Sequence, residues 1–346
     1  MSPRKVRYLH YAVHIAAAAL LVACWLQPVS AAQTADAAAD ADAAAHENWR
    51  AVISQNPDLR EGCFQASFPS IVWNEVECKE LHPRVHPVVR KPGEGQVAGN
   101  GNDYVAESSG LTSAAIGSFP TVTGVKSEKG VGVAGYGDGG ILGPNEYSLQ
   151  LNTNFTGTTA ACKGHSGCVV WQQFIYATDY AVVGEAAVFM QYWLIGWGSS
   201  ACPSGFGRDG AGDCYGNSNY VSAPDVKPTS LGRLSLSGAA AAGGKDTVVF
   251  TDGSTAYRVS GSDSVLDISQ VWKESEFNVV GDAGGSRADF NQPVSIKVKV
   301  ALTDGTTSAP TCVANAGTTG ESNNLNLGKC STASGSSPSI QFTESN

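Results

Sequence analysis

From about residue 99 to the C-terminus, short apolar stretches are broken by Gly, Asn, Asp and Ser about every eight to twelve residues, a spacing typical of β-sandwiches and barrels. Asp252-Gly253 and Asp304-Gly305 each follow a run rich in β-branched residues, and Asp-Gly supplies the positive φ of a tight hairpin turn. Between residues 294 and 300 apolar and polar side chains alternate, as in a strand with one buried face. We therefore expect an all-β chain, with an antiparallel β-sandwich of the jelly-roll or concanavalin-like kind over residues 99–346.

The first 31 residues have the pattern of a secretory signal peptide. Arg4, Lys5 and Arg7 precede an apolar run that ends at Leu26 and is followed by small residues. The run is shorter than the roughly 20 residues that span a membrane, so we expect no transmembrane segment and a secreted protein, extracellular or periplasmic. The residues around Cys24 also resemble a lipobox, which would make Cys24 a lipid anchor.

The sequence has 9 cysteines, and removal of the signal peptide with Cys24 leaves an even number. These fall as near neighbours along the chain, and an exported chain favours their oxidation. The expected disulfides are Cys63–Cys78, Cys162–Cys168, Cys202–Cys214 and Cys312–Cys330. No Cys-x-x-Cys spacing occurs among them, so we expect neither a metal site nor another cofactor.

The charge balance excludes one class of partner. The whole chain has 22 basic against 31 acidic residues, and loss of the signal peptide removes only basic ones. Such an acidic protein has too few cations to neutralise phosphates, so nucleic acid is not an expected partner.

The segment before the sandwich divides into three parts. Residues 32–45 contain only Ala, Asp, Thr and Gln, and we expect them to form a flexible leader. A short helix is expected over His46–Leu59, ending at Asn56-Pro57. Residues 46–98 as a whole are expected to form a short disulfide-clipped cap or propeptide-like segment, which continues as a Pro-rich tether from His82.

Amide and indole side chains gather between residues 147 and 193. Three candidate strands cover residues 147–152, 170–176 and 188–194, and alternation puts the amides of each strand on one face. If the strands are adjacent, their polar faces form a groove that suits a polysaccharide or an extended peptide. Filling of the core by the aromatic residues is the alternative. The expected ligand-binding residues are Gln150, Asn152, Trp171, Gln173, Gln191 and Trp193.

The two aromatic strands, at 171–176 and 189–193, and the run 213–217 resemble the glutamic peptidases of the eqolisin type and the neprosin-type prolyl peptidases. The resemblance covers about 70 residues. It implies a secreted β-sandwich enzyme, made with a propeptide, that works at acid pH and activates water with a strand Gln and a strand Glu. Gln150 matches the Gln, whereas Gln173 or a residue near it falls at the Glu position. That departure matters because an amide cannot act as a general acid or base.

A carboxylate could reach the groove from elsewhere in the chain. Glu185 lies in the connection between the two aromatic strands, and the catalytic candidates are Gln150, Gln173 and Glu185. A surface or turn role is the alternative for each acid. Residues 321–327 alternate and are expected to form a late strand. The other acids considered are Glu146, Asp179, Glu276 and Asp282.

Three functions follow as hypotheses. The first is secreted binding of a polysaccharide or other glycan in the amide- and Trp-lined groove. The second is an acid-pH glutamic peptidase with a propeptide ending near Arg90-Lys91. The third is a structural cell-surface protein.

Overall fold

The computed structural model describes residues 31–55, 60–81, 104–133, 141–314 and 316–346. The signal peptide, with Cys24, and the Arg90-Lys91 boundary lie outside these residues. Residues 44–346 form one compact unit, separate from residues 1–43. No helix among the described residues combines the length and the apolar character needed to cross a membrane.

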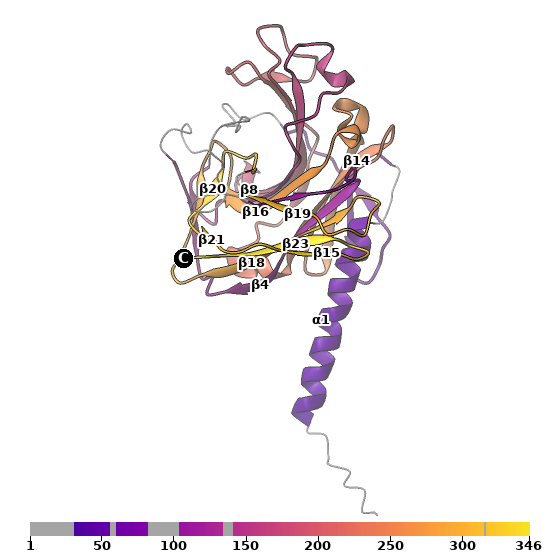
Figure 1. Ribbon diagram of the computed structural model, residues 1–346. Helices are drawn as coiled ribbons and strands as arrows, with labels where there is room; N and C mark the ends of the chain where they lie inside the picture. Colours follow the sequence, from indigo (N-terminus) through magenta and orange to yellow (C-terminus); the bar gives the residue numbers. More distant parts are fainter. Residues whose placement is uncertain (1–30, 56–59, 82–103, 134–140, 315) are drawn as a thin grey trace, which may run out of the picture. The chain divides into compact units, whose positions relative to one another are not determined.

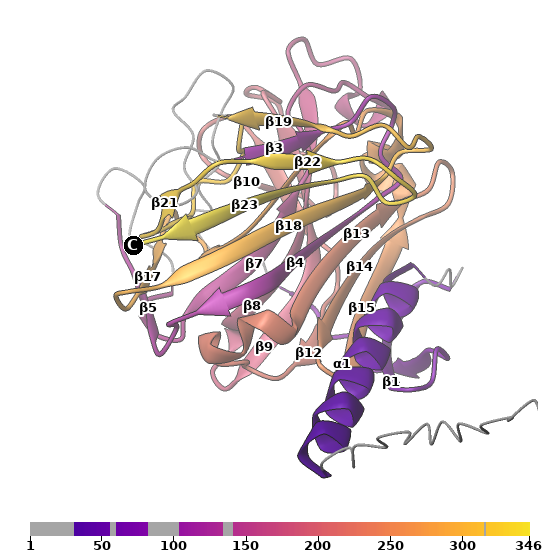
Figure 2. The same ribbon diagram turned by 60° about the horizontal axis from the view of Figure 1, so that its bottom comes forward.

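The compact unit is an antiparallel β-sandwich, which confirms the predicted fold class. Ten strands form the first large sheet, and Figure 2 shows most of them running side by side. In spatial order they are β2 (Asn74–Val76), β1 (Gly62–Ser67), β15 (Thr255–Ser262), β14 (Lys245–Asp252), β13 (Leu234–Ala240), β4 (Ala114–Thr123), β18 (Ser295–Thr303), β23 (Ser339–Ser345) and β21 (Asn326–Leu327), with β22 (Ser331–Ala333) beside β23.

The second large sheet has nine strands and carries the candidate site. Figure 1 shows β8 and β16 of this sheet in a different layer from β18 and β4. In spatial order its strands are β10 (Gly207–Arg208), β11 (Cys214–Asn217), β9 (Glu185–Ile195), β8 (Val169–Val182), β7 (Tyr147–Asn152), β16 (Glu274–Gly281), β3 (Tyr104–Glu107) and β19 (Thr311–Ala314), with β12 (Val221–Ala223) beside β9.

Smaller elements complete the fold. A four-stranded sheet contains β20 (Ser322–Asn323), β17 (Arg287–Phe290), β5 (Glu128–Val131) and β6 (Gly143–Pro144). The helices are α1 (Ala31–Gln55) and the 3-10 helices η1 (Ala160–Cys162), η2 (Pro228–Arg233), η3 (Asp263–Val265) and η4 (Ile268–Gln270).

The N-terminal segment contains a helix and a strand of the sandwich. Residues 32–45, expected to form a flexible leader, are part of α1, because alanine has the highest helix propensity and dominates this stretch. The expected cap contains the Cys63–Cys78 disulfide. Its strand β1 pairs with β15 from Gly62 to Ser67 and so forms part of the ten-stranded sheet.

All four expected disulfides are present, each between near neighbours in the sequence. Cys63, Cys162, Cys168 and Cys214 are at most 1% exposed. These bridges therefore join short loops to the core of the sandwich, and they are compatible with an extracellular location.

Close packing between the sheets requires glycine at two positions. A Cβ added at Gly117 would lie 2.0 Å from the ring of Phe277, and one added at Gly238 would lie 2.3 Å from the ring of Phe174. Both rings come from the nine-stranded sheet. Because Gly117 on β4 and Gly238 on β13 have no side chain, the two sheets can approach each other at these positions.

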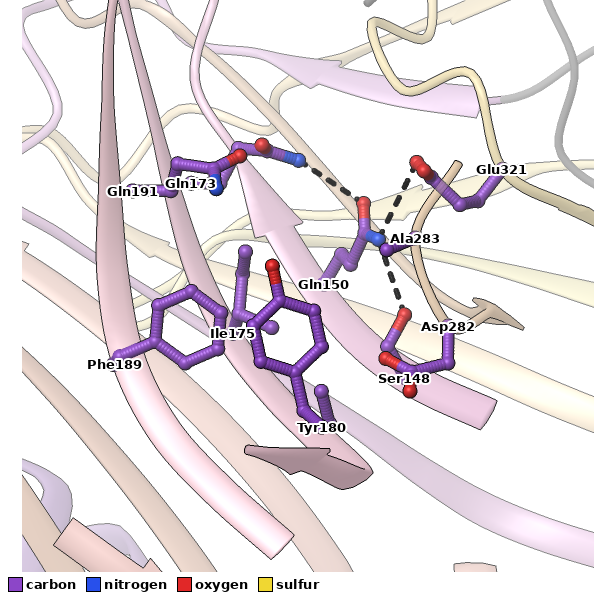
Figure 3. A pocket seen from close by; sticks show the side chains of 11 residues that line it. Ser148, Gln150, Gln173, Ile175, Tyr180, Phe189, Gln191, Asp282, Ala283 and Glu321 are labelled. Atoms are coloured by element: carbon purple, nitrogen blue, oxygen red, sulfur yellow. Dashed lines mark hydrogen bonds between the residues drawn. The ribbon is translucent and has the colours of Figure 1, made fainter. Parts of the chain in front are cut away.

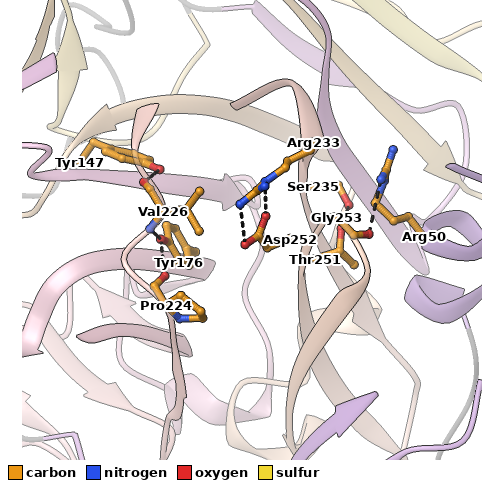
Figure 4. A network of polar contacts seen from close by, with 10 residues as sticks. All are labelled: Arg50, Tyr147, Tyr176, Pro224, Val226, Arg233, Ser235, Thr251, Asp252 and Gly253. Atoms are coloured by element: carbon orange, nitrogen blue, oxygen red, sulfur yellow. Dashed lines mark hydrogen bonds and ion pairs between the residues drawn. The ribbon is translucent and has the colours of Figure 1, made fainter. Parts of the chain in front are cut away.

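Two buried tyrosines fix the strands that carry the site (Figure 4). The Tyr147 hydroxyl donates to the carbonyl oxygen of Val226, and the Tyr176 hydroxyl donates to that of Pro224 at 2.9 Å. Tyr176 also accepts from the Val226 N–H at 2.9 Å. Burial raises the pKa of both hydroxyls, so they stay protonated donors. The loop after β12 is thereby bound to β7 and β8 from the core side.

We expect Gly238→Ala to destabilise the protein by about 1–3 kcal/mol, because its new methyl group would overlap the Phe174 ring. Denaturant unfolding monitored by tryptophan fluorescence measures this. Gly232→Ala is the matched control, since a Cβ there meets its nearest atom at 3.7 Å. Equal stability of the two variants would contradict the proposed packing.

Stability should also depend on pH, because several carboxyl groups are buried. Burial is the largest cause that raises the pKa of Glu128 to about 9, that of Asp246 to about 8 and that of Glu344 to about 7. In the unfolded chain these groups ionise near 4. Between those values the folded state binds more protons than the unfolded state, so the free energy of unfolding falls as pH rises.

Thermal unfolding between pH 4 and pH 9 checks this. We expect the melting temperature to fall as pH rises through this range, and Glu128→Gln to reduce the slope because the amide does not ionise. A melting temperature that rises continuously from pH 4 to pH 9 would contradict the expectation.

Candidate functional site

The site lies on the face of the nine-stranded sheet that points away from the core. On β7, Leu149 and Leu151 enter the core between the sheets, so Ser148, Gln150 and Asn152 point to the opposite face. The three expected strands are adjacent, with β8 between β7 and β9. Asn152 lies opposite Gln173, and Gln173 lies opposite Gln191.

These amides form a continuous hydrogen-bonded row. Trp193 Nε1 donates to Gln173 Oε1 at 3.2 Å and to Gln191 Oε1 at 2.9 Å. Gln173 Nε2 then donates to Gln150 Oε1 and to Asn152 Oδ1, each at 3.1 Å. Gln173 therefore turns its NH₂ group away from the indole, toward Gln150 and Asn152, whereas Gln191 Nε2 donates to Asn217 Oδ1 at 2.9 Å.

The row branches at Gln173, and each of the two branches meets a glutamate. Gln150 Nε2 lies 3.5 Å from Glu321 Oε2 and 3.1 Å from Ser148 Oγ. Asn152 Nδ2 lies 3.3 Å from Glu276 Oε2. Glu321 comes from the segment before β20, and Glu276 comes from β16, where it pairs with Asn152. The carboxylate that the two-glutamine arrangement lacked is thus supplied from distant parts of the chain.

Glu321 is 5% exposed and held from several sides. Its Oε1 accepts from the Gly285 N–H at 3.2 Å, and its Oε2 accepts from the Thr319 hydroxyl. Burial raises the pKa of this carboxyl, while the hydrogen bonds from Thr319, Gly285 and Gln150 partly oppose the rise. Glu321 therefore takes up a proton at a higher pH than an ordinary glutamate does.

Glu276 is 2% exposed, and its two oxygens differ. Oε2 accepts from the Thr318 N–H at 2.6 Å and from the Thr318 hydroxyl at 2.8 Å, besides Asn152. Oε1 has no hydrogen-bond partner among the described residues. Thr318 also accepts from Trp171 Nε1 at 3.2 Å. Glu276 thus connects β16 and β7 to the segment that carries Glu321.

A small cavity lies between Glu321 and the amides (Figure 3). Its volume of about 30 Å³ is enough for one or two water molecules and too small for a sugar ring. In Figure 3 the side-chain amide of Gln150 lies between the amide of Gln173 and the carboxylate of Glu321. The cavity is lined by Ser148, Gln150, Gln173, Ile175, Ala177, Tyr180, Phe189, Gln191, Asp282, Ala283 and Glu321.

The expected indole platforms are buried. Trp171 and Trp193 are each 1% exposed, and their ring centroids are 5.8 Å apart. Trp193 also stacks on Tyr215, and Trp171 contacts Phe155 edge-on. Both rings therefore act as packing and, through their N–H groups, as donors. Ligand binding by the amide and indole residues stays a prediction.

Glu185, the predicted catalytic carboxylate, does not lie with the amides. It pairs with Lys79 at 2.7 Å and accepts from the Tyr220 hydroxyl at 3.2 Å. The reason is the length of the β8–β9 hairpin. Glu185 and Gln191 are six positions apart on β9, which is about 20 Å along an extended strand. Of the other acids considered, Glu276 touches the amide row and Asp282 lines the cavity.

The sequence interpretation missed the contact of Glu321 with the amides. It assigned this residue to a late strand, whereas β20 begins one residue later at Ser322. The available signal was the run Thr318-Thr319-Gly320-Glu321, which is polar and lies beside an alternating stretch. Nothing in that run indicated contact with Gln150, which precedes Glu321 by 171 positions.

Comparison with protein-family models, with curated proteins and with solved structures finds no match for this chain. The resemblance to glutamic peptidases therefore stays a prediction that depends on short motifs.

Trp193→Phe tests the orientation of the amide row. The ring is kept but the N–H donor is lost, so we expect the side-chain NH₂ signals of Gln150, Gln173 and Gln191 to shift or broaden in ¹⁵N NMR spectra. Trp272→Phe is the control, because that indole donates to Glu274 O and Ser275 Oγ outside the row. Unchanged amide signals in a folded Trp193→Phe variant would contradict this orientation.

Proposed function

We propose that this protein is a secreted hydrolase of peptide bonds that uses Glu321 and Gln150 to activate water. The observation that carries the proposal is the Gln150 Nε2 to Glu321 Oε2 distance of 3.5 Å at the edge of a cavity of water size. The predicted signal peptide, the four disulfides and the glutamic-peptidase resemblance support the same assignment.

The chemistry requires a base and a hydrogen-bond donor on the same reacting carbonyl group. The ionised Glu321 carboxylate accepts a proton from water as the water oxygen bonds to the carbonyl carbon. The C=O electron pair moves to the carbonyl oxygen, where the Gln150 NH₂ group donates a hydrogen bond to the developing negative charge. The proton on Glu321 then passes to the amine nitrogen as the C–N bond breaks, which regenerates the carboxylate.

The other amides have a positioning role. Gln173 Nε2 donates a hydrogen bond to the side-chain carbonyl oxygen of Gln150, so the NH₂ group of Gln150 is the part that faces Glu321. Gln150 and Glu321 are buried, where the dielectric is lower than that of water. The hydrogen bond from Gln150 to the developing negative charge is therefore stronger than it would be in water.

Glycan binding fits this geometry less well. Neither Trp171 nor Trp193 exposes a ring face on which a sugar could stack, since each is 1% exposed. A peptide needs no such platform, so it is preferred to the polysaccharide as the partner.

Glu321→Gln is the decisive variant. We expect it to lower the rate of cleavage of an unfolded protein substrate by at least about 100-fold, because an amide cannot accept the proton. In the wild type, kcat/KM should rise with pH through the raised pKa of the Glu321 carboxyl. Mass spectrometry of casein digests between pH 3 and pH 8 measures both.

Glu344→Gln is the matched control. Glu344 is also a fully buried glutamate with a raised pKa, and it also accepts from amides, those of Asn278 at 2.7 Å and Asn323 at 3.0 Å. It does not line the cavity, so we expect it to cleave at the wild-type rate. Cleavage by Glu321→Gln at the wild-type rate, or no cleavage by the wild type after preincubation at pH 4, would overturn the proposal.

A further inference from the structure

A short segment after Cys78 crosses from one large sheet to the other. Residues 79–81, named here the strap, follow β2 of the ten-stranded sheet. Lys79 then pairs with Tyr220 in a β-bridge: Lys79 N donates to Tyr220 O at 3.0 Å, and Tyr220 N donates to Lys79 O at 2.9 Å. Tyr220 directly precedes β12, which pairs with β9. The strap backbone therefore lies beside the strands of the candidate site.

An ion pair holds the strap at its first residue. Lys79 Nζ lies 2.9 Å and 2.7 Å from the two carboxylate oxygens of Glu185. The Tyr220 hydroxyl donates to the same carboxylate at 3.2 Å. The Lys79 side chain is 39% exposed, so the pair fixes the position of the strap more than it stabilises the whole fold.

The last residue of the strap covers the apolar side of the site. Leu81 is 9% exposed and belongs to a cluster that includes Ile175, Tyr180 and Phe189. These three residues also line the cavity with Gln150 and Glu321. Figure 3 shows them grouped beside the amides, on the side away from Glu321.

Three properties of the strap match those of a bound peptide. Its first residue forms an antiparallel β-bridge with Tyr220, and backbone pairing of an added segment is a common mode of peptide recognition. Its Leu81 side chain fills an apolar cluster next to the groups assigned to hydrolysis. The Cys63–Cys78 disulfide anchors the chain directly before it, so the strap can lift without displacing β1.

We propose that Leu81 occupies the subsite for an aliphatic side chain of the substrate, and that the strap blocks this subsite until it lifts. The substrate part of this inference rests on the proposed hydrolase function. The expected substrates are peptides with leucine or a side chain of similar size and branching at the position bound by Ile175, Tyr180 and Phe189.

The test uses N-acetyl-leucinamide as the probe and a Glu321→Gln background, so that binding is measured without cleavage. Leu81→Ala empties the subsite, and we expect it to bind the probe about tenfold more tightly than the parent, as judged from burial of one leucine side chain. Titration followed by NMR of the aromatic ring signals measures the affinity. N-acetyl-alaninamide should show a much smaller gain.

Two further variants separate the strap from general loosening of the fold. Leu111→Ala removes a leucine that is 45% exposed and lies outside the cluster, so it should leave the affinity unchanged. Glu185→Gln keeps Leu81 but weakens the ion pair between Lys79 and residue 185. It should raise both the affinity for the probe and the rate of hydrogen exchange at the Tyr220 amide, which donates to Lys79 O. Glu61→Gln, which weakens the Lys245–Glu61 ion pair instead, should do neither.

The outcomes distinguish the two proposals. If Leu81→Ala binds the probe no more tightly than the parent, the strap inference is overturned even when Glu321→Gln abolishes cleavage. If Glu321→Gln in the otherwise wild-type protein cleaves at the normal rate, the proposed hydrolase mechanism is overturned. Tighter binding of the probe by Leu81→Ala would still support an apolar subsite that the strap blocks. Cleavage sites without enrichment of leucine or isoleucine would overturn the substrate assignment alone.

Discussion

The Trp193 N–H group fixes the direction of the amides in the site. An indole nitrogen can only donate, so the Gln173 side chain must turn its carbonyl oxygen toward it. The Gln173 NH₂ group then faces the carbonyl oxygens of Gln150 and Asn152. Their own NH₂ groups are left to face Glu321 and Glu276. A single donor thus determines which end of each amide meets a carboxylate.

This order explains why so polar a face can be buried. Each amide uses its oxygen in one direction and its nitrogen in the other, so desolvation of the row is offset by hydrogen bonds. Glu321 is the member for which burial outweighs the hydrogen bonds, since its pKa is raised despite three donors. A buried carboxyl with a raised pKa is typical of functional sites.

The sequence predicted the local features and missed the distant contact. Near-neighbour cysteines, Asp-Gly turns and alternation are short-range patterns, and they led to the correct disulfides and fold class. The three amide-bearing strands follow one another along the chain, so their adjacency could also be expected. The contact between Gln150 and Glu321 spans 171 positions and depends on how β16 and β20 are placed. The sequence interpretation chose Glu185, which lies between the two aromatic strands but which the length of β9 places away from the amides.

Glu321 is a buried carboxyl that faces Gln150 and retains its proton above the usual pH range. Its ionisation can be followed directly by infrared difference spectroscopy of the wild type against Glu321→Gln, since only the wild type can gain or lose a carboxylic acid C=O band at this position. We expect the band to persist above pH 4.5, the ordinary pKa of glutamate. Loss of the band at or below that pH would contradict it.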